Sequence, residues 1–214
     1  GTVNASAALA LPGVQKLVPL PGFAGSTAGF AVVGKTTWHA RQGAQAVDVQ
    51  WRQRAAGALD SKQIESELEA ALKTDKGVTF FSQGDIHAAE ASAAHLLEAS
   101  YHAPYLAHAT MEPMNCTAQV QGGMVEVWAP TQALSLARAI AAKVAGVSPD
   151  QVTLHVTLLG GGFGRRLDVD YVAQVVHVAM ACGGRPVPGA ARMVARGRPT
   201  HDFYRPMNMA HLRA

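Results

Sequence analysis

The chain has 214 residues, of which 49% are hydrophobic and 15% are charged, so it can bury a sizeable core and is not disordered as a whole. Its formal net charge is +3, and its lysines and arginines are scattered, whereas a nucleic-acid-binding surface needs a basic cluster. The two cysteines, Cys116 and Cys182, form no CxxC pair and are predicted to be free, buried thiols, and no apolar run reaches the length of a membrane-spanning helix.

The first hundred residues alternate between helical and extended patterns, which predicts a compact α+β unit over residues 1–51 and further elements beyond a polar linker at 52–60. Pro12 and Gly13 mark a turn, and Asp60 or Ser61 can cap the first helix after the linker. The expected helices are 5–11, 35–47, 61–72 and 85–94, and the expected strands are 14–20, 30–33, 47–51, 78–81 and 96–102.

The second half of the chain shows a hairpin followed by alternating helices and strands. The dipeptide Gly122-Gly123 separates two alternating segments, which is typical of a β-hairpin. Thr131 is expected to cap the next helix, and Gly146 is expected to end it. The expected strands are 115–120, 124–128 and 152–159, and the expected helices run from 131 to 144 and from Asp168 or Asp170 to Cys182.

Residues 160–166, called the glycine loop below, read Gly-Gly-Gly-Phe-Gly-Arg-Arg and lie between an expected strand and an expected helix. Glycines let the backbone approach a ligand closely, successive N–H groups can cradle anionic oxygens, and Arg165 and Arg166 add positive charge. The loop matches neither a P-loop nor a dinucleotide-binding GxGxxG motif. Two interpretations stay open: a loop that binds an anionic ligand, and a glycine-rich connection whose arginines are solvated.

The glycine loop resembles the corresponding loop in large subunits of the xanthine dehydrogenase/aldehyde oxidase family. Residues 107–118 (AHATMEPMNCTA) and 201–206 (HDFYRP) resemble the isoquinoline 1-oxidoreductase beta-subunit branch in order and spacing. The resemblance implies an internal part of a molybdopterin-binding large subunit with an α+β fold. The implied divisions are a partial hammerhead α/β domain at 1–55, a helical linker at 56–95 and the N-terminal part of a mixed α/β molybdopterin-binding domain at 96–214.

This resemblance implies a parent enzyme, a molybdenum hydroxylase that acts on aldehydes or N-heterocycles with water-derived oxygen. The implied cofactor is molybdopterin, as its cytosine dinucleotide, with molybdenum, and [2Fe–2S] clusters are implied on an iron–sulfur small subunit. The rest of the large subunit is the other implied partner; neither nucleic acid nor a membrane span is expected. This stretch alone is expected to be inactive and need not hold the cofactor by itself.

Rival interpretations of the chain stay open beside the enzyme. One is a non-catalytic module that binds a phosphate or nucleotide or serves assembly, and the other is a structural piece without a ligand. The sequence leaves both a cytoplasmic and a periplasmic location open.

No catalytic or metal-ligating residue is expected in this chain, because the base glutamate of the family matches no position here. By resemblance, Phe163 and Gly164 match the loop positions that approach the molybdenum oxo group. Leu106 and Leu167 stand where xanthine-type members have a glutamine and a substrate-contacting glutamate, which argues against a purine substrate. The expected cofactor-binding residues are Gly161, Gly162, Phe163, Gly164 and Arg165.

Two polar residues of the 107–118 segment have alternative interpretations. The apolar neighbours of Glu112 predict a raised pKa, and the favoured interpretation is a carboxylate bonded to nearby backbone rather than a group of the cofactor pocket. For His108, a hydrogen-bonded core histidine is favoured over a ligand-orienting one.

Residues 186–200 depart from the family pattern, which has a strand and a Trp-Ser-Arg-Glu-Asp-Asp-like turn here. Codons for residues 193–199, read one base later, must begin with Trp and can continue with Ser-Arg-Glu-Asp-Asp. We hypothesise a pair of compensating frameshifts, which a DNA sequence without such a reading would rule out. With the residues as they stand, Pro188 and Gly189 predict that the strand is lost.

Overall fold

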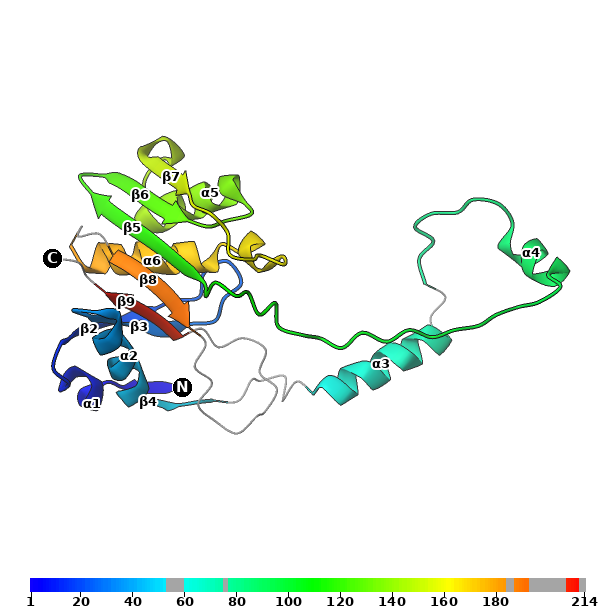
Figure 1. Ribbon diagram of the computed structural model, residues 1–214, viewed down its shortest axis with the longest axis horizontal. Helices are drawn as coiled ribbons and strands as arrows, with labels where there is room; N and C mark the ends of the chain where they lie inside the picture. Colours follow the sequence, from blue (N-terminus) through cyan, green and yellow to red (C-terminus); the bar gives the residue numbers. More distant parts are fainter. Residues whose placement is uncertain (53–59, 75–76, 184–186, 193–206, 212–214) are drawn as a thin grey trace. The chain divides into compact units, whose positions relative to one another are not determined.

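The computed structural model describes residues 1–52, 60–74, 77–183, 187–192 and 207–211 (Figure 1). The chain divides into two compact units, one formed by residues 1–54 together with 108–214 and the other by residues 55–107. The glycine loop and most of the 107–118 segment therefore belong to the same unit.

The first unit is built on a mixed seven-stranded sheet (Figure 1). The strand order is β2-β3-β9-β8-β5-β6-β7, in which β3–β9 and β6–β7 are parallel and the other paired neighbours are antiparallel. The strands are β2 (Val14–Leu20), β3 (Gly29–Gly34), β5 (Asn115–Gln121), β6 (Met124–Ala129), β7 (Val152–Val156), β8 (Val187–Arg192) and β9 (Met207–His211).

Helices α5 (Leu134–Ala145) and α6 (Asp170–Ala181) pack against the sheet and form the main core. Helix α5 buries small residues such as Ala137, and α6 buries valines such as Val172. The same cluster includes Val18 of β2, so one core extends from the N-terminal hairpin to the second half of the chain. Burial of this apolar surface provides the main favourable contribution to folding of the unit.

Strand β3 is buried on both faces, which explains its continuous apolar sequence. Ala31 and Val33 join the main core, whereas Phe30 and Val32 pack in a second cluster that includes alanines of α2 (Thr37–Ala46). The other elements of this part are α1 (Ser6–Leu9) and the antiparallel pair β1 (Thr2–Asn4) and β4 (Asp48–Gln50).

Most predicted elements of the first unit are confirmed, with boundary changes of a few residues. Gly122-Gly123 form the turn between β5 and β6, and Gly146 ends α5 with a φ of 70°. The predicted cap at Thr131 is wrong, because α5 begins only at Leu134 and Ala133 is its N-cap. A 3-10 helix, η1 (Pro149–Gln151), follows α5, and β7 ends at Val156 rather than at residue 159.

The second unit contains α3 (Ser61–Thr74) and α4 (Ile86–Ser92), both predicted. The Asp60 carboxylate accepts hydrogen bonds from the first turn of α3, and Asp85 accepts one from Ala88 at 3.0 Å. The predicted strands at 78–81 and 96–102 are wrong, since neither segment pairs with a strand among the residues that the structure describes.

Strand β8 contradicts the expected loss of the strand after residue 186. Its backbone pairs with β5 from Val187 to Ala190 and with β9 from Gly189 to Arg192. Pro188 lies before the first residue that pairs with β9, which is a position where proline is tolerated near the start of a strand. Residues 193–200 and the HDFYRP segment at 201–206 lie outside the described residues, so the frameshift hypothesis stays a prediction.

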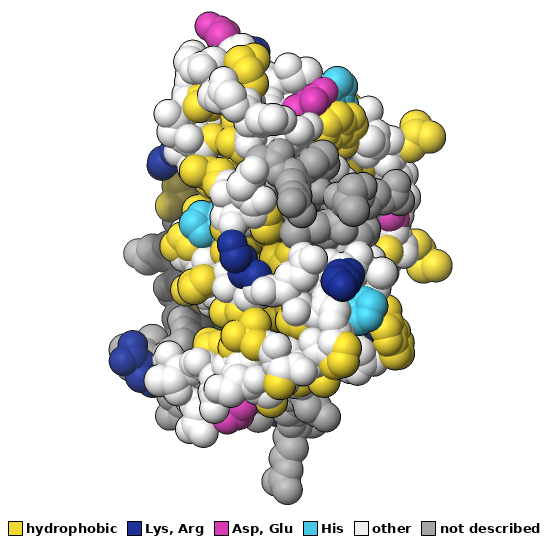
Figure 2. Space-filling model, turned by 90° about the vertical axis from the view of Figure 1, so that its left-hand side faces the viewer, with side chains coloured by type: hydrophobic (Ala, Val, Ile, Leu, Met, Phe, Trp, Pro, Cys, Tyr) yellow, Lys and Arg dark blue, Asp and Glu magenta, His cyan; other side chains and the backbone are white. Residues whose placement is uncertain are grey.

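The predicted α+β fold class is confirmed, whereas the partial hammerhead domain and the three domain boundaries stay predictions. No helix in the described ranges is both long and apolar enough to span a bilayer. On the face drawn in Figure 2, described Lys and Arg side chains lie scattered between hydrophobic and neutral ones.

Candidate functional site

Three segments that are distant in sequence meet where the neighbouring strands β5, β6 and β7 begin or end on the same side of the sheet. The segments precede β5, follow β6 and follow β7, and the strand pairings bring these ends together, because β5 is antiparallel and β7 parallel to β6. The Thr157 N–H donates to the Ala129 carbonyl at 3.3 Å, and the Gln132 N–H donates to the Arg166 carbonyl at 3.0 Å. Crevices at the carboxyl ends of parallel strands are where ligands bind in many α/β sheets.

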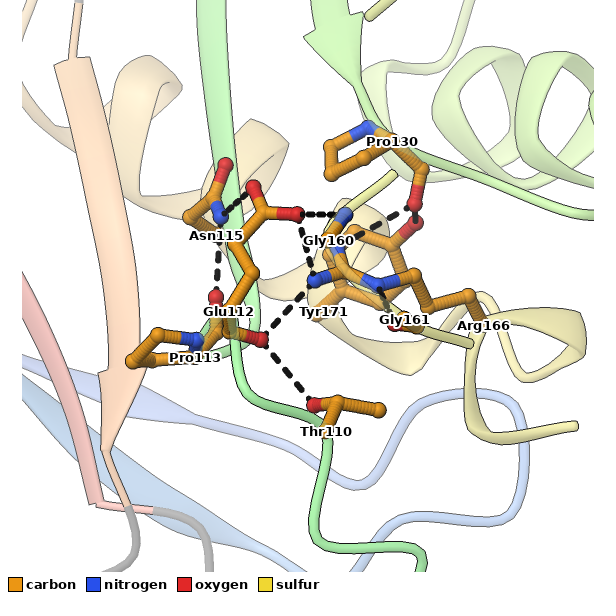
Figure 3. A network of polar contacts seen from close by, with 9 residues as sticks. All are labelled: Thr110, Glu112, Pro113, Asn115, Pro130, Gly160, Gly161, Arg166 and Tyr171. Atoms are coloured by element: carbon orange, nitrogen blue, oxygen red, sulfur yellow. Dashed lines mark hydrogen bonds and ion pairs between the residues drawn. The ribbon is translucent and has the colours of Figure 1, made fainter. Parts of the chain in front are cut away.

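Arg166 is fully buried at the centre of this meeting point (Figure 3). Its Nε donates to the Gly161 carbonyl at 3.1 Å, and its Nη1 donates to the Pro130 carbonyl at 3.3 Å. Its Nη2 donates to the Glu112 carbonyl at 2.9 Å and to the Glu112 carboxylate at 3.0 Å. One guanidinium therefore ties all three segments together, and the interpretation of a solvated Arg166 is wrong.

Glu112 is the acidic partner of Arg166 and also binds the glycine loop directly. Its Oε2 accepts the Gly160 N–H at 2.6 Å, and its Oε1 accepts Nδ2 of Asn115 at 2.7 Å. The backbone adds a further bond, in which the Glu112 N–H donates to the Gly160 carbonyl at 3.1 Å. The carboxylate is bonded to backbone as predicted, but that backbone belongs to the glycine loop.

The pKa of Glu112 is lowered, so the expectation of a raised pKa is wrong. Burial, the largest single influence, would raise it, but the bonds from Asn115 and Gly160 and the charge of Arg166 together outweigh burial. Gly160 and Arg166 are far from Glu112 in sequence, so the apolar neighbours of Glu112 in the sequence predicted a pKa shift in the wrong direction. The carboxylate is therefore ionised at neutral pH and supplies a fixed negative charge opposite Arg166.

The middle of the glycine loop exposes backbone donors. Gly161 and Gly164 have φ values of 95° and 92°, and Phe163 has a φ of 51°, which is rare for a bulky residue. Within the described part of the chain, no protein acceptor receives the backbone N–H groups of Gly161, Gly162, Phe163 and Gly164. Four successive N–H groups without a described protein acceptor, in a loop with positive φ at three of the four residues, form a favourable environment for anionic oxygens.

Arg165 points its charge at the following helix. Its Nη1 and Nη2 donate to the two carboxylate oxygens of Asp170 at 3.0 and 2.9 Å, and Nη1 lies 3.6 Å from Asp168. Its side chain is 12% exposed, so a solvated Arg165 is also wrong. The pair with Asp170 fixes the end of the glycine loop against α6, and contact of Arg165 with a cofactor stays a prediction.

Gly160 and Gly162 lie where a side chain would collide with neighbouring residues. A Cβ at Gly160 would overlap the Glu112 side chain, and a Cβ at Gly162 would lie 2.5 Å from Oε1 of Gln132. Sequence reasoning did not single out Gln132, which directly follows Thr131 and lies beside the loop. Its position depends on the return of the chain after β7, which no local pattern reveals.

Three of the remaining residues singled out in the sequence lie at the surface, whereas the two cysteines do not. His108 is exposed rather than in the core, although its ring lies beside Gly164. Leu106 and Leu167 are also exposed. Cys116 is buried and Cys182 is half-buried, and both are free thiols whose pKa burial raises.

The donor set suits an anionic or oxo-bearing group. The N–H groups of residues 161–164, which have no acceptor within the described part of the chain, offer hydrogen bonds, and three of the four residues lack a Cβ. Among the described residues, no cluster of three His, Cys, Asp or Glu side chains could hold a metal ion directly. The resemblance implies that the metal of this site is carried by molybdopterin.

Comparison with known proteins supports this assignment. Residues 71–194 match the family described as the molybdopterin cofactor-binding domain. The isoquinoline 1-oxidoreductase subunit beta of Brevundimonas diminuta is 28% identical over 190 residues, covering 85% of this chain and 24% of that subunit. The aldehyde oxidoreductase molybdenum-binding subunit PaoC of Escherichia coli O157:H7 is 30% identical over 182 residues, covering 85% of this chain and 24% of that subunit.

Two solved structures share the fold. Quinoline 2-oxidoreductase from Pseudomonas putida 86 matches with a TM-score of 0.59 and 16% sequence identity. The match covers 100% of this chain and 29% of the quinoline 2-oxidoreductase chain. Aldehyde oxidoreductase from Desulfovibrio gigas matches with a TM-score of 0.61 and 18% sequence identity. The match covers 89% of this chain and 27% of the aldehyde oxidoreductase chain.

The curated relatives are much longer than this chain, which spans only 24% of the length of each of the two named above. The family match covers more than half of the chain and includes both the Glu112 segment and the glycine loop. The chain therefore belongs to the molybdopterin cofactor-binding domain family, in the molybdenum-binding subunits of the xanthine dehydrogenase family.

Proposed function

We propose that this chain is part of the molybdenum-cofactor subunit of an oxidoreductase that hydroxylates aldehydes or N-heterocycles with water-derived oxygen. The observation that carries the proposal is the row of four free N–H groups at residues 161–164, held in place by the buried Arg166. The names of an isoquinoline and an aldehyde oxidoreductase among the relatives support the two substrate classes.

In this proposal, Gly161, Gly162, Phe163 and Gly164 bind the cofactor through their backbone. When bound, the molybdenum cofactor supplies the two-electron redox chemistry. The loop donates hydrogen bonds from N–H groups that are already oriented, so little reorganisation is needed when negative charge develops on the atom they face. Arg165, whose guanidinium is held by Asp170, directly follows this row of N–H groups, and we propose that it too contacts the cofactor.

The finer parts of the proposal concern the cofactor form and the partners. We infer the cytosine dinucleotide form of molybdopterin, [2Fe–2S] clusters on an iron–sulfur small subunit, and completion of the site by the rest of the large subunit. Because no position here matches the base glutamate of the family, we expect the chain alone to be inactive.

The substrate inference rests on two apolar positions. Leu106 and Leu167 replace the glutamine and the glutamate that xanthine-type members use, and both side chains are exposed in this chain. Neither can hydrogen-bond a purine, so a less polar aldehyde or N-heterocycle fits better.

The test is a Gly162→Val variant of the intact protein that contains this chain. A valine side chain at this position collides with Gln132 and displaces the row of N–H groups, so we expect loss of molybdenum and of the cytidine nucleotide released on denaturation. The control is Gly122→Val in the β5–β6 turn, where a Cβ meets nothing within 4 Å but the φ of 58° makes the change costly for folding.

The control should keep its molybdenum content. Equal molybdenum in the Gly162→Val variant and the unmodified protein would contradict binding by the loop. A different released nucleotide would contradict only the cytosine dinucleotide form.

A further inference from the structure

We propose that Glu112 and Arg166 are positioning residues, which set the glycine loop so that its free N–H groups face the group they bind. This inference rests on the proposed molybdenum-cofactor function. The relevant feature is that Glu112 contacts the first residue of the loop, whereas Arg166 is its last residue (Figure 3). The pair therefore joins the two ends of the loop, and residues 162–164 lie between the joined ends.

The donors and acceptors at this base are matched in number and kind. Three donors converge on the two carboxylate oxygens of Glu112: Nδ2 of Asn115 on Oε1, and the Gly160 N–H and Nη2 of Arg166 on Oε2. A glutamine at 112 has a single acceptor oxygen, and its NH₂ group would oppose one of these donors. No neutral residue of the same shape can therefore satisfy the base of the loop.

The backbone bonds make the arrangement directional. Arg166 donates to the Gly161 carbonyl and to the Glu112 carbonyl, so those two carbonyls point inward. A peptide unit whose carbonyl points inward directs its N–H the opposite way, because the peptide bond is planar and trans. The N–H of Gly162, which belongs to the same peptide unit as the Gly161 carbonyl, is thereby turned away from Arg166.

Glu112→Gln in the intact enzyme is the primary test, because an Arg166 variant would leave several buried carbonyls unsatisfied and endanger folding. We expect the hydrogen-bonded amides of Glu112, Gly160 and Arg165 to exchange hydrogen for deuterium about tenfold faster, because a hydrogen bond to a charged group is lost and the loop ends loosen. We also expect a shifted Mo(V) electron paramagnetic resonance spectrum and a kcat lower by about 100-fold with a smaller change in KM, because the reacting group is misplaced.

A rescue variant tests the specific hydrogen-bond arrangement. In Glu112→Gln/Asn115→Asp, the new carboxylate can accept the glutamine NH₂, and the glutamine oxygen can accept from Gly160 and Arg166. We expect this double variant to recover part of the amide protection and of the spectrum. The stability control is Val176→Ala in the buried part of α6, which creates a cavity in the main core.

The possible results separate this inference from the proposed function. Unchanged amide exchange in Glu112→Gln, or an equal change in Val176→Ala, would overturn the positioning role even if the enzyme contains molybdenum. If the unmodified enzyme contains no molybdenum, the proposed function fails, and faster exchange with rescue still supports positioning of the loop. Faster exchange without rescue by the double variant would overturn the hydrogen-bond arrangement described here.

Discussion

Arg166 has no exposed surface, and a guanidinium taken out of water is stable only when its charge and its donors are satisfied. Its partners are the carboxylate of Glu112 and three backbone carbonyls from three segments of the chain. Leaving a buried donor without its partner costs about 1–3 kcal/mol, a sizeable share of the roughly 5–15 kcal/mol that stabilise a typical domain. The pair therefore links the stability of the first unit to the geometry of its glycine loop.

The lowered pKa of Glu112 makes this link depend on pH. A carboxylate whose pKa is lower in the folded than in the unfolded state stabilises the fold above the unfolded pKa of about 4.3, and this stabilisation is lost as the pH falls through the folded value. We expect Glu112→Gln to lower the free energy of unfolding by about 1–3 kcal/mol at pH 7 and by less at low pH. Urea unfolding at several pH values measures the difference.

Asp150→Asn is the matched control for this pH profile. Asp150 also pairs with an arginine, Arg138, at 3.3 Å, but its side chain is 93% exposed. Exposed pairs contribute little, so we expect a small effect that is similar at every pH. A Glu112→Gln penalty that is the same in acid as at neutral pH would contradict the assigned role of the carboxylate.

Phe163 shows what sequence reasoning can and cannot find at the scale of a residue. The run of glycines and the resemblance indicated the loop, but not the φ of 51° at Phe163 or the 72% exposure of its side chain. Such a conformation persists only when the surrounding structure enforces it. The loop that contains Phe163 is bonded at its first residue, Gly160, to Glu112, 48 positions earlier. Those contacts leave no signal in the local sequence.

At the scale of elements, periodicity predicted the helices and the paired strands well. The β5–β6 hairpin and helix α6 lie where alternation and helical spacing indicated. The segments 78–81 and 96–102 have the β-branched, aromatic and leucine residues of strands, yet they form none, because a strand also needs a partner. Strand β8 shows the converse, since pairing on both sides outweighs the unfavourable Pro188 and Gly189.

The end of α5 offers a test at the same scale. Gly146 has a φ of 70° and a ψ of 33°, and its N–H donates back to Ala142. An alanine in this left-handed conformation costs about 1–2 kcal/mol, whereas asparagine tolerates it better. We therefore expect Gly146→Ala to lower the free energy of unfolding by about 1 kcal/mol. Gly146→Asn should cost less in the same urea titration, and an equal cost would contradict the capping explanation.

For the whole molecule, the sheet topology explains why residues from distant segments form one site. The segment before β5, the turn after β6 and the glycine loop after β7 meet because these three strands are neighbours. The resemblance identified two of these segments by their motifs. The turn with Pro130 and Gln132 became visible only when the strand order placed it between them.

Molybdenum content tests the central claim most directly. The measurement is the number of molybdenum atoms per large subunit, by elemental analysis, in the intact native protein that contains this chain. The proposed function predicts a ratio near one, in a host whose other molybdenum enzymes are active. A ratio near zero in that host would contradict it and would leave residues 160–166 as a phosphate-binding or purely structural loop.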